Sequence, residues 1–275
     1  MEKRARNSIL CPNCRSLISI DETQCPHCGL RNPGSRWKNV FFRKGLFGAD
    51  RIIVNIISVN VGMYILSILI KPGSTVLSAN PLSFLSPGAT SLLLLGASGT
   101  IPIDQLHRWW SVLTASWLHG GILHIFFNMI VLRQIGPFIV QEYGAYRMFS
   151  IYTLSGAGGF LASYLAGVPF TIGASAAVCG LIGAALYFGK SRGGQYGQAV
   201  YRQVGGWAIG IFLFGFLVPG INNWAHGGGL LCGALTGFLL GYHERDQENY
   251  FHKLLAAICV LSTLAALLAG VGSLL

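Results

Sequence analysis

Residues 173–180 read Gly-Ala-Ser-Ala-Ala-Val-Cys-Gly, and they place one serine, Ser175, at the start of an apolar segment that runs to Gly189. A short turn bounded by glycine and proline precedes this serine. Small residues let membrane helices pack closely, so the stretch by itself favours a packing role for the hydroxyl group. The residues that change this interpretation lie far away in the sequence, on both sides of Ser175.

The composition indicates a membrane protein. Of the 275 residues, 52% are hydrophobic and only 10% are charged, whereas soluble domains carry about 25% charged residues. A net charge of +10 could attract nucleic acid, but ten of the nineteen Lys and Arg residues lie in residues 1–51 and most others lie in short loops. This distribution is typical of membrane topology signals, so it favours the lipid bilayer as partner and argues against nucleic acid.

The charge and cysteine patterns predict three parts. We expect a cytoplasmic zinc ribbon in residues 1–31, a basic and aromatic linker on the inner leaflet in residues 32–51, and a membrane domain in residues 52–275. No apolar run precedes residue 52, so we expect no cleavable signal peptide. The N-terminus would then stay in the cytoplasm, where thiols remain reduced.

Two CxxC knuckles predict the zinc site, with the ligands Cys11, Cys14, Cys25 and Cys28. Each knuckle can supply two thiolates to a tetrahedral Zn²⁺ ion from a tight turn. Two disulfides would need an oxidising compartment, and a redox role would need a βαβ context. The zinc would be structural, because so small a ribbon cannot bury much core. The pattern leaves open whether the ribbon binds a cytoplasmic partner, binds nucleic acid or simply caps the N-terminus.

An all-α, polytopic membrane helix bundle is predicted for the rest of the chain. Seven apolar segments are candidates for membrane helices, and they lie at 52–70, 122–141, 146–167, 175–190, 203–218, 224–242 and 254–274. We expect the segment 71–121 to lie in the membrane interface. An eighth span across 82–97 is rejected, because Pro87 and Gly88 interrupt a short apolar run. The Lys and Arg distribution places the starts of the fourth and sixth spans near the outer face.

Polar residues at the starts of three spans suggest a catalytic site. The sixth span opens with His226, and an ionisable side chain in a span is a functional candidate. His124 and Asn128 lie four residues apart on one face of the second span, and both can donate hydrogen bonds to an oxyanion. Each could instead make interhelical hydrogen bonds. The small residues expected to pack the fourth and sixth spans together are Gly173, Gly180, Gly229 and Gly233.

The acidic residues exclude other protease classes. None of the nine Asp and Glu residues lies at the centre of a span, so the two carboxylates of an aspartyl protease are missing. The HExxH motif of a zinc protease is missing too. A third triad member is not evident, which leaves a Ser–His dyad that needs no cofactor for catalysis. A channel or transporter remains an alternative, although the lack of acidic residues within spans weakens a proton-coupled version.

Taken together, these residues resemble the rhomboid family of intramembrane serine proteases. The chain matches its GxSxxxxG motif at 173–180, its AHxxGxxxG motif at 225–233 and its HxxxN motif at 124–128. The resemblance implies a six-helix core with one C-terminal helix and single-span membrane proteins as substrates. It implies that Ser175 is the nucleophile and His226 its general base. His124, Asn128 and the N–H of Ser175 would form the oxyanion hole, near the outer face of a prokaryotic cytoplasmic membrane.

The chain departs from the family pattern in three places. Ala176 stands where the family usually has glycine, and Cys179 stands where it commonly has an aromatic residue. Ser111 follows Trp110 where the family has arginine. The first two differences keep open the alternative that this is a catalytically inactive relative, which binds transmembrane helices without cutting them.

Overall fold

The structure is a computed structural model, and it describes residues 8–11, 16–27, 29–34, 48, 51–77 and 83–273. The chain divides into two compact units, Met1–Asn55 and Ile56–Leu275.

The first unit contains a small antiparallel sheet. Strand β1 (Ser8–Leu10) pairs with β2 (Leu17–Ser19). Cys11 and Cys25 are buried with Ile18 in one hydrophobic cluster. Both cysteines lie in tight turns, since the N–H of Cys11 donates to Ser16 and that of Cys25 donates to Leu30.

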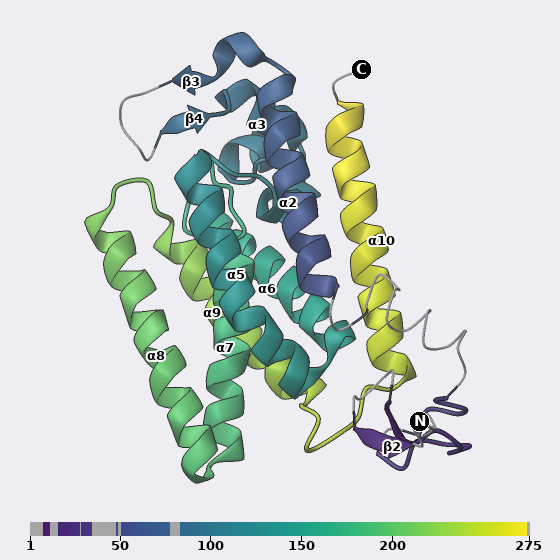
Figure 1. Ribbon diagram of the computed structural model, residues 1–275. Coiled ribbons are helices and arrows are strands. Elements are labelled where there is room, and N and C mark those ends of the chain that lie inside the picture. Colours follow the sequence, from purple (N-terminus) through teal and green to yellow (C-terminus); the bar gives the residue numbers. More distant parts are fainter. Residues whose placement is uncertain are drawn as a thin grey trace, which may run out of the picture. The chain divides into compact units, whose positions relative to one another are not determined.

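Seven long helices follow within the described part of the chain (Figure 1), and they are α2 (Ile52–Leu69), α5 (Ile122–Tyr143), α6 (Ala145–Leu165), α7 (Ser175–Arg192), α8 (Gly194–Leu217), α9 (Asn223–Leu240) and α10 (Tyr250–Gly272). Six of them begin within four residues of a predicted span. The exception is α8, which was expected to begin at residue 203. Its first turns carry polar residues, which a hydropathy pattern does not assign to a membrane helix.

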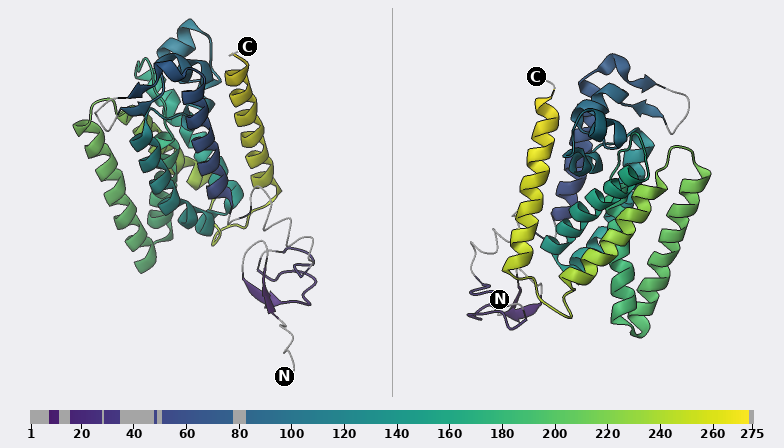
Figure 2. Two further views of the ribbon diagram at one scale, coloured as in Figure 1. Left: turned by 45° about the horizontal axis from the view of Figure 1, so that its top comes forward. Right: turned by 180° about the vertical axis from the view of Figure 1, so that it is seen from behind.

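The helices differ in how much they expose to the surroundings. By length and composition, α2, α5, α8 and α10 are apolar enough to cross a membrane. Among the described helices, α6, α7 and α9 fall outside this set, and most residues of α7 are buried by its neighbours. A helix enclosed by protein needs fewer lipid-facing apolar side chains. Helices α8 and α10 lie on opposite flanks of the bundle in all three views (Figures 1 and 2).

The segment between α2 and α5 folds into short elements. They are η1 (Pro72–Ser74), β3 (Val76–Leu77), β4 (Phe84–Ser86), α3 (Ala89–Leu95), η2 (Ile101–Gln105), α4 (Ser111–Thr114) and η3 (Ala115–Trp117). The longest has 7 residues, so none of these described elements can span a membrane. Strands β3 and β4 form an antiparallel hairpin, which the all-α prediction missed.

Arg108 anchors this segment. Its Nη1 donates to the carbonyl oxygen of Leu93 at 2.8 Å, and its guanidinium lies 5.7 Å from the centre of the Trp110 ring. The arginine that the family pattern places after Trp110 is replaced by Ser111, which is buried and lies 3.3 Å from the hydroxyl of Ser98. The segment is therefore tied down by a different arginine.

Helices α7 and α9 touch backbone to backbone. A methyl group added at Gly233 would collide with the backbone of Gly180, and one added at Gly229 would collide with the carbonyl of Ala176. One added at Gly180 would collide with the side chain of Ser155 on α6. These three predicted packing glycines therefore lie at contacts that leave no room for a side chain, and the fourth, Gly173, lies against the ring of His124.

Candidate active site

Ser175 is the first residue of α7, and it is partly exposed, whereas its neighbours along the chain are buried. From Gly173 to Ala185, every residue except Ser175 is buried. The first N–H groups of a helix have no helical carbonyl to bond, and they form its positive end. The hydroxyl of Ser175 therefore lies in accessible space beside backbone donors.

Gly173 brings Ser175 and His124 together. Its φ of +127° lies in a region that side chains rarely adopt, and its N–H donates to the carbonyl of Ala115 at 2.9 Å. A methyl group added at Gly173 would lie 2.6 Å from Nε2 of His124 and 3.6 Å from Oγ of Ser175. The imidazole and the hydroxyl thus border the same small space, and glycine keeps it open.

The proton on His124 is fixed by a neighbouring amide. The N–H of Gly120 donates to Nδ1 of His124 at 3.2 Å. Because Nδ1 accepts this hydrogen bond, the proton of the neutral ring is on Nε2. Nε2 is also the atom that faces Gly173, so His124 presents a hydrogen-bond donor to the space beside Ser175.

Asn128 lies one turn below His124 on α5. It is buried, and its Nδ2 donates to the carbonyl oxygen of His124 at 2.8 Å. A carboxamide has two N–H hydrogens, so one remains for another acceptor.

His226 lies in the first turn of α9 and is buried. Its neighbour Ala225 packs with Ala176, the residue after Ser175, in one cluster. The start of α9 is therefore held against the start of α7. Nδ1 of His226 has no hydrogen-bond partner among the described residues, so no described carboxylate completes a triad.

Asn222 is a residue of this region that the sequence interpretation missed. Its Oδ1 accepts from the N–H of Ala225 at 3.1 Å and caps α9. Its Nδ2 lies 2.6 Å from the hydroxyl of Ser163 on α6 and 2.9 Å from that of Thr171, just before α7. One side chain thus joins α6, the start of α9 and the segment that leads into α7. An asparagine just before an apolar span is a recognisable helix-cap signal, although it does not reveal the other two contacts.

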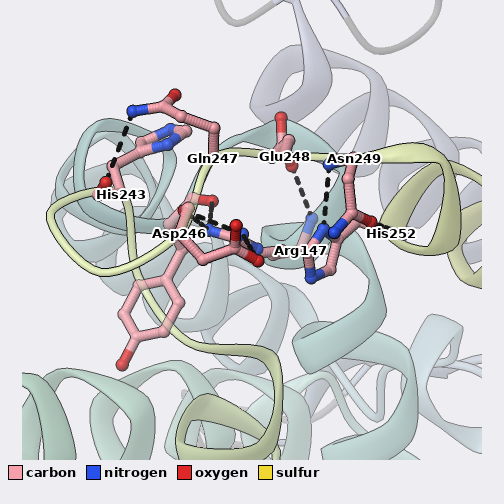
Figure 3. A network of polar contacts seen from close by, with 8 residues as sticks. Arg147, His243, Asp246, Gln247, Glu248, Asn249 and His252 are labelled. Atoms are coloured by element: carbon pink, nitrogen blue, oxygen red, sulfur yellow. Dashed lines mark hydrogen bonds and ion pairs between the residues drawn. The ribbon is translucent and has the colours of Figure 1, made fainter. Parts of the chain in front are cut away.

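The end of the bundle away from Ser175 holds a polar network (Figure 3). The buried Arg147 donates two hydrogen bonds of 2.9 Å to the carbonyl oxygen of Asp246. Oε1 of Glu248 accepts from the N–H groups of Tyr146 and Arg147 at 2.8 and 3.0 Å. The loop between α9 and α10 is thereby fastened to the start of α6, with an arginine and carboxylates far from the candidate site.

Two groups in this loop have shifted pKa values. Burial raises the pKa of Glu248 above its usual range, although Arg147 beside it acts in the opposite direction. Burial lowers the pKa of His243 to about 4, and the charges of Arg147 and His252 add to this effect. His243 is therefore neutral in the folded protein at neutral pH.

The predicted zinc ligands are described only in part. The thiols of Cys11 and Cys25 are buried in the same cluster, which fits the donors that Zn²⁺ requires. Cys14 and Cys28 lie outside the described residues. Among those that are described, no group of three or more possible metal ligands occurs, and the zinc ribbon stays a prediction.

Comparison with known proteins finds a Rhomboid domain over residues 106–243. The chain is 36% identical over 183 residues to RHOMBOID-like protein 6, mitochondrial, of Arabidopsis thaliana, which covers 63% of this chain and 59% of that protein. It is 32% identical over 181 residues to Rhomboid protease GluP of Bacillus subtilis (strain 168), and the matched region covers 64% of this chain and 34% of that protein. It is also 36% identical over 159 residues to Inactive RHOMBOID-like protein 8 of Arabidopsis thaliana, and the matched region covers 56% of this chain and 44% of that protein.

These relatives are longer than the regions that match this chain, and their names differ in activity. The chain spans less than two thirds of the length of each of them. One is named a protease and one is named inactive, so similarity alone does not decide activity. They come from a plant and a bacterium, and one is named mitochondrial, so the expected prokaryotic cytoplasmic membrane is not supported. A multi-pass membrane protein is supported by the domain and by the four apolar helices.

Proposed function

The chain belongs to the rhomboid family, and on that premise we propose that it is an intramembrane serine endopeptidase with a Ser175–His226 dyad. The observation that carries this proposal is the position of Ser175. It is the one accessible residue at the start of a buried helix, and the Nε2 donor of His124 borders the same space.

The reaction would begin when Oγ of Ser175 attacks the carbonyl carbon of a peptide bond. His226 would take the hydroxyl proton, and Nε2 is the ring nitrogen available because Nδ1 is enclosed. The carbonyl oxygen would become an oxyanion, held by Nε2–H of His124, the free N–H of Asn128 and the N–H of Ser175. His226 would then return its proton to the leaving amine, and water would hydrolyse the acyl-enzyme.

The substrates would be single-span membrane proteins. A peptide bond inside a helix is hydrogen-bonded and closed to attack, so the substrate backbone must unwind near the site. Helix-breaking small residues at the outer end of the substrate span would permit this. The Lys and Arg residues of the predicted inner loops lie at the end of the bundle away from Ser175, which supports a cytoplasmic N-terminus and a site near the outer face.

A fluorophosphonate probe tests the proposal on the full chain in detergent. We expect the wild-type protein to be labelled covalently and the Ser175→Ala variant to remain unlabelled with an unchanged melting temperature. We also expect His226→Ala to abolish cleavage of a single-span substrate. If wild type takes up no more probe than Ser175→Ala, the protease proposal fails.

A catalytically inactive relative is the second candidate. It is favoured by Ala176 and Cys179, both fully packed within α7, and by the similarity to an inactive family member. Such a protein would bind transmembrane helices without cutting them. This second candidate predicts that wild type and Ser175→Ala both capture a single-span protein. It also predicts that the fluorophosphonate probe labels neither of them.

For the N-terminal unit we propose a structural zinc ion bound by Cys11, Cys14, Cys25 and Cys28. The two described thiols are buried in one cluster, which supports the proposal. Metal analysis of the full chain in reducing buffer should give one zinc per chain, and none after all four cysteines are changed to serine. Zinc-free wild-type protein would contradict it.

A further inference from the structure

A cavity of about 280 Å³ lies between the end of α7 and the start of α8. Its lining residues are Gly189, Lys190, Gly193, Gln198, Tyr201 and Arg202. Lys190 follows Ser175 by fifteen residues on the same helix, about 22 Å along its axis at ~1.5 Å per residue. The cavity therefore lies at the opposite depth of the bundle from the candidate active site.

Close helix contact shapes this cavity. A methyl group added at Gly189 would lie 2.8 Å from the carbonyl oxygen of Gly197 and 2.8 Å from the backbone nitrogen of Tyr201. The helices touch at these two glycines. The chain reverses at Gly193, whose φ is +66°. The cavity is thus part of a rigid helix hairpin.

Four polar side chains border the cavity, and two of them carry a positive charge. Lys190 and Arg202 contribute two cations, and neither makes a hydrogen bond or ion pair with another described residue. Lys190 lies in the last turn of α7, where a cation offsets the negative end of the helix, but this does not account for Arg202 in α8. Gln198 and Tyr201 add an amide and a hydroxyl group.

Carboxylates near the cavity are already engaged. The two carboxylate oxygens of Glu244 share the single N–H of Arg192 Nε, at 2.9 and 3.0 Å. Glu142 accepts from the hydroxyl of Tyr196 at 2.8 Å. Two cations without a counter-ion therefore border a cavity that contains no acidic side chain, and this favours an anion with several acceptor oxygens, such as a phosphate group.

The surroundings of the cavity indicate that the phosphate belongs to a lipid. Tyr196 and Tyr201 are 42% and 45% exposed, and tyrosine is enriched at the depth of lipid headgroups. Further along α8, Ile209 and Leu213 are more than half exposed, as expected for a lipid-facing helix. Basic pockets between membrane helices bind anionic headgroups at this depth. We propose that this cavity binds the phosphate group of an anionic phospholipid.

Thermal unfolding of the full chain in a non-ionic detergent tests the proposal. Phosphatidylglycerol added to the micelles should raise the melting temperature of wild type in a concentration-dependent way, because it binds the folded state. Phosphatidylcholine and inorganic phosphate at the same concentrations should not. The Lys190→Gln/Arg202→Gln variant should need at least about tenfold more phosphatidylglycerol, as expected when charge-assisted hydrogen bonds are lost.

The matched control is Arg245→Gln/Lys253→Gln, which removes the same charge at two residues that do not line the cavity. It should respond to phosphatidylglycerol as wild type does. Native mass spectrometry of folded protein counts bound lipids directly, so the comparison holds even if a variant melts early. An equal loss in the control, an equal response to phosphatidylcholine or to inorganic phosphate, or no response at all would overturn the proposal.

Discussion

The N–H of Gly120 decides which nitrogen of His124 carries a proton, and so what this side chain can do at the site. With Nδ1 engaged, the imidazole can only donate toward Ser175. Asn128 is constrained in a similar way, because one of its amide hydrogens is bound to its own helix. Both residues are therefore oriented before any substrate arrives, which is what electrostatic stabilisation of an oxyanion requires.

Asn128→Ala should lower kcat by about 10²–10³, as expected for the loss of one oxyanion donor. The measurement is cleavage of a single-span substrate in detergent or proteoliposomes. The matched control is Asn60→Ala on α2, because Nδ2 of Asn60 donates to the carbonyl of Ile56 at 2.8 Å, also four residues back along its helix. Unchanged turnover in Asn128→Ala would remove this residue from the site.

Gly173→Ala should abolish cleavage, because the new methyl group would displace the ring of His124 and strain the backbone. Gly167→Ala separates these two causes. Gly167 has a φ of +78° but no atom near the position of an added methyl group, so its variant carries backbone strain alone. Gly167→Ala should keep most of its activity, and an equal loss in both variants would show that strain is the cause.

At the scale of elements, the candidate site depends on the contact between α7 and α9. Ser175 and His226 each lie at the start of one of these helices, and glycines bring the two backbones together. Small shifts of either helix would therefore change the distance between the nucleophile and its base.

Gly233→Ala should destabilise the fold by about 1–3 kcal/mol, the usual cost of overpacking, because the methyl group would collide with the backbone of Gly180. Thermal unfolding in detergent measures this, and cleavage should fall as well. Gly210→Ala on α8 is the control, since its methyl group would meet nothing within 4 Å. Equal melting temperatures for the two variants would contradict the packing argument.

The sequence could predict the helices but not how their ends are connected. Helix positions follow from long apolar runs, and the error at α8 arose because its polar first turns, next to Gly193, have no hydropathy signal. The hairpin of β3 and β4 was missed because its strands have only two and three residues. The contacts of Asn222 and of Arg147 join residues 50 to 100 positions apart, which no local pattern reports.

At the scale of the molecule, the two ends of the bundle differ in chemistry. One end holds the candidate site, which contains histidines, a serine and an asparagine. Among the described residues, no carboxylate bonds to Nδ1 of its His226. The other holds the network of Figure 3, in which Arg147 and Glu248 fasten the loop before α10 to α6. The last helix is thus secured at an end that contains ionisable groups.

This network should make stability sensitive to acid. His243 has a pKa of about 4 when folded and about 6.5 when unfolded, so the unfolded chain binds more protons between these values. The contribution of His243 is fully present above pH 6.5 and is lost as the pH falls toward 4. We expect His243→Asn to show a smaller drop in melting temperature between pH 7 and pH 5 than wild type shows.

The control for this experiment is His107→Asn, which removes an exposed histidine outside the network. Its melting temperature should follow that of wild type across the pH range. A His243→Asn variant with the acid sensitivity of wild type would show that other groups cause the effect.

The contact between α7 and α9 has a consequence for inactivation. Side chains can change rotamer and absorb a displacement, but a seam made of main-chain atoms has no such freedom. We therefore expect the two helices to separate cooperatively rather than to loosen the dyad by gradual steps. On slow heating, activity should persist almost unchanged and then vanish together with the helical packing, so that the inactivation curve and the unfolding curve coincide.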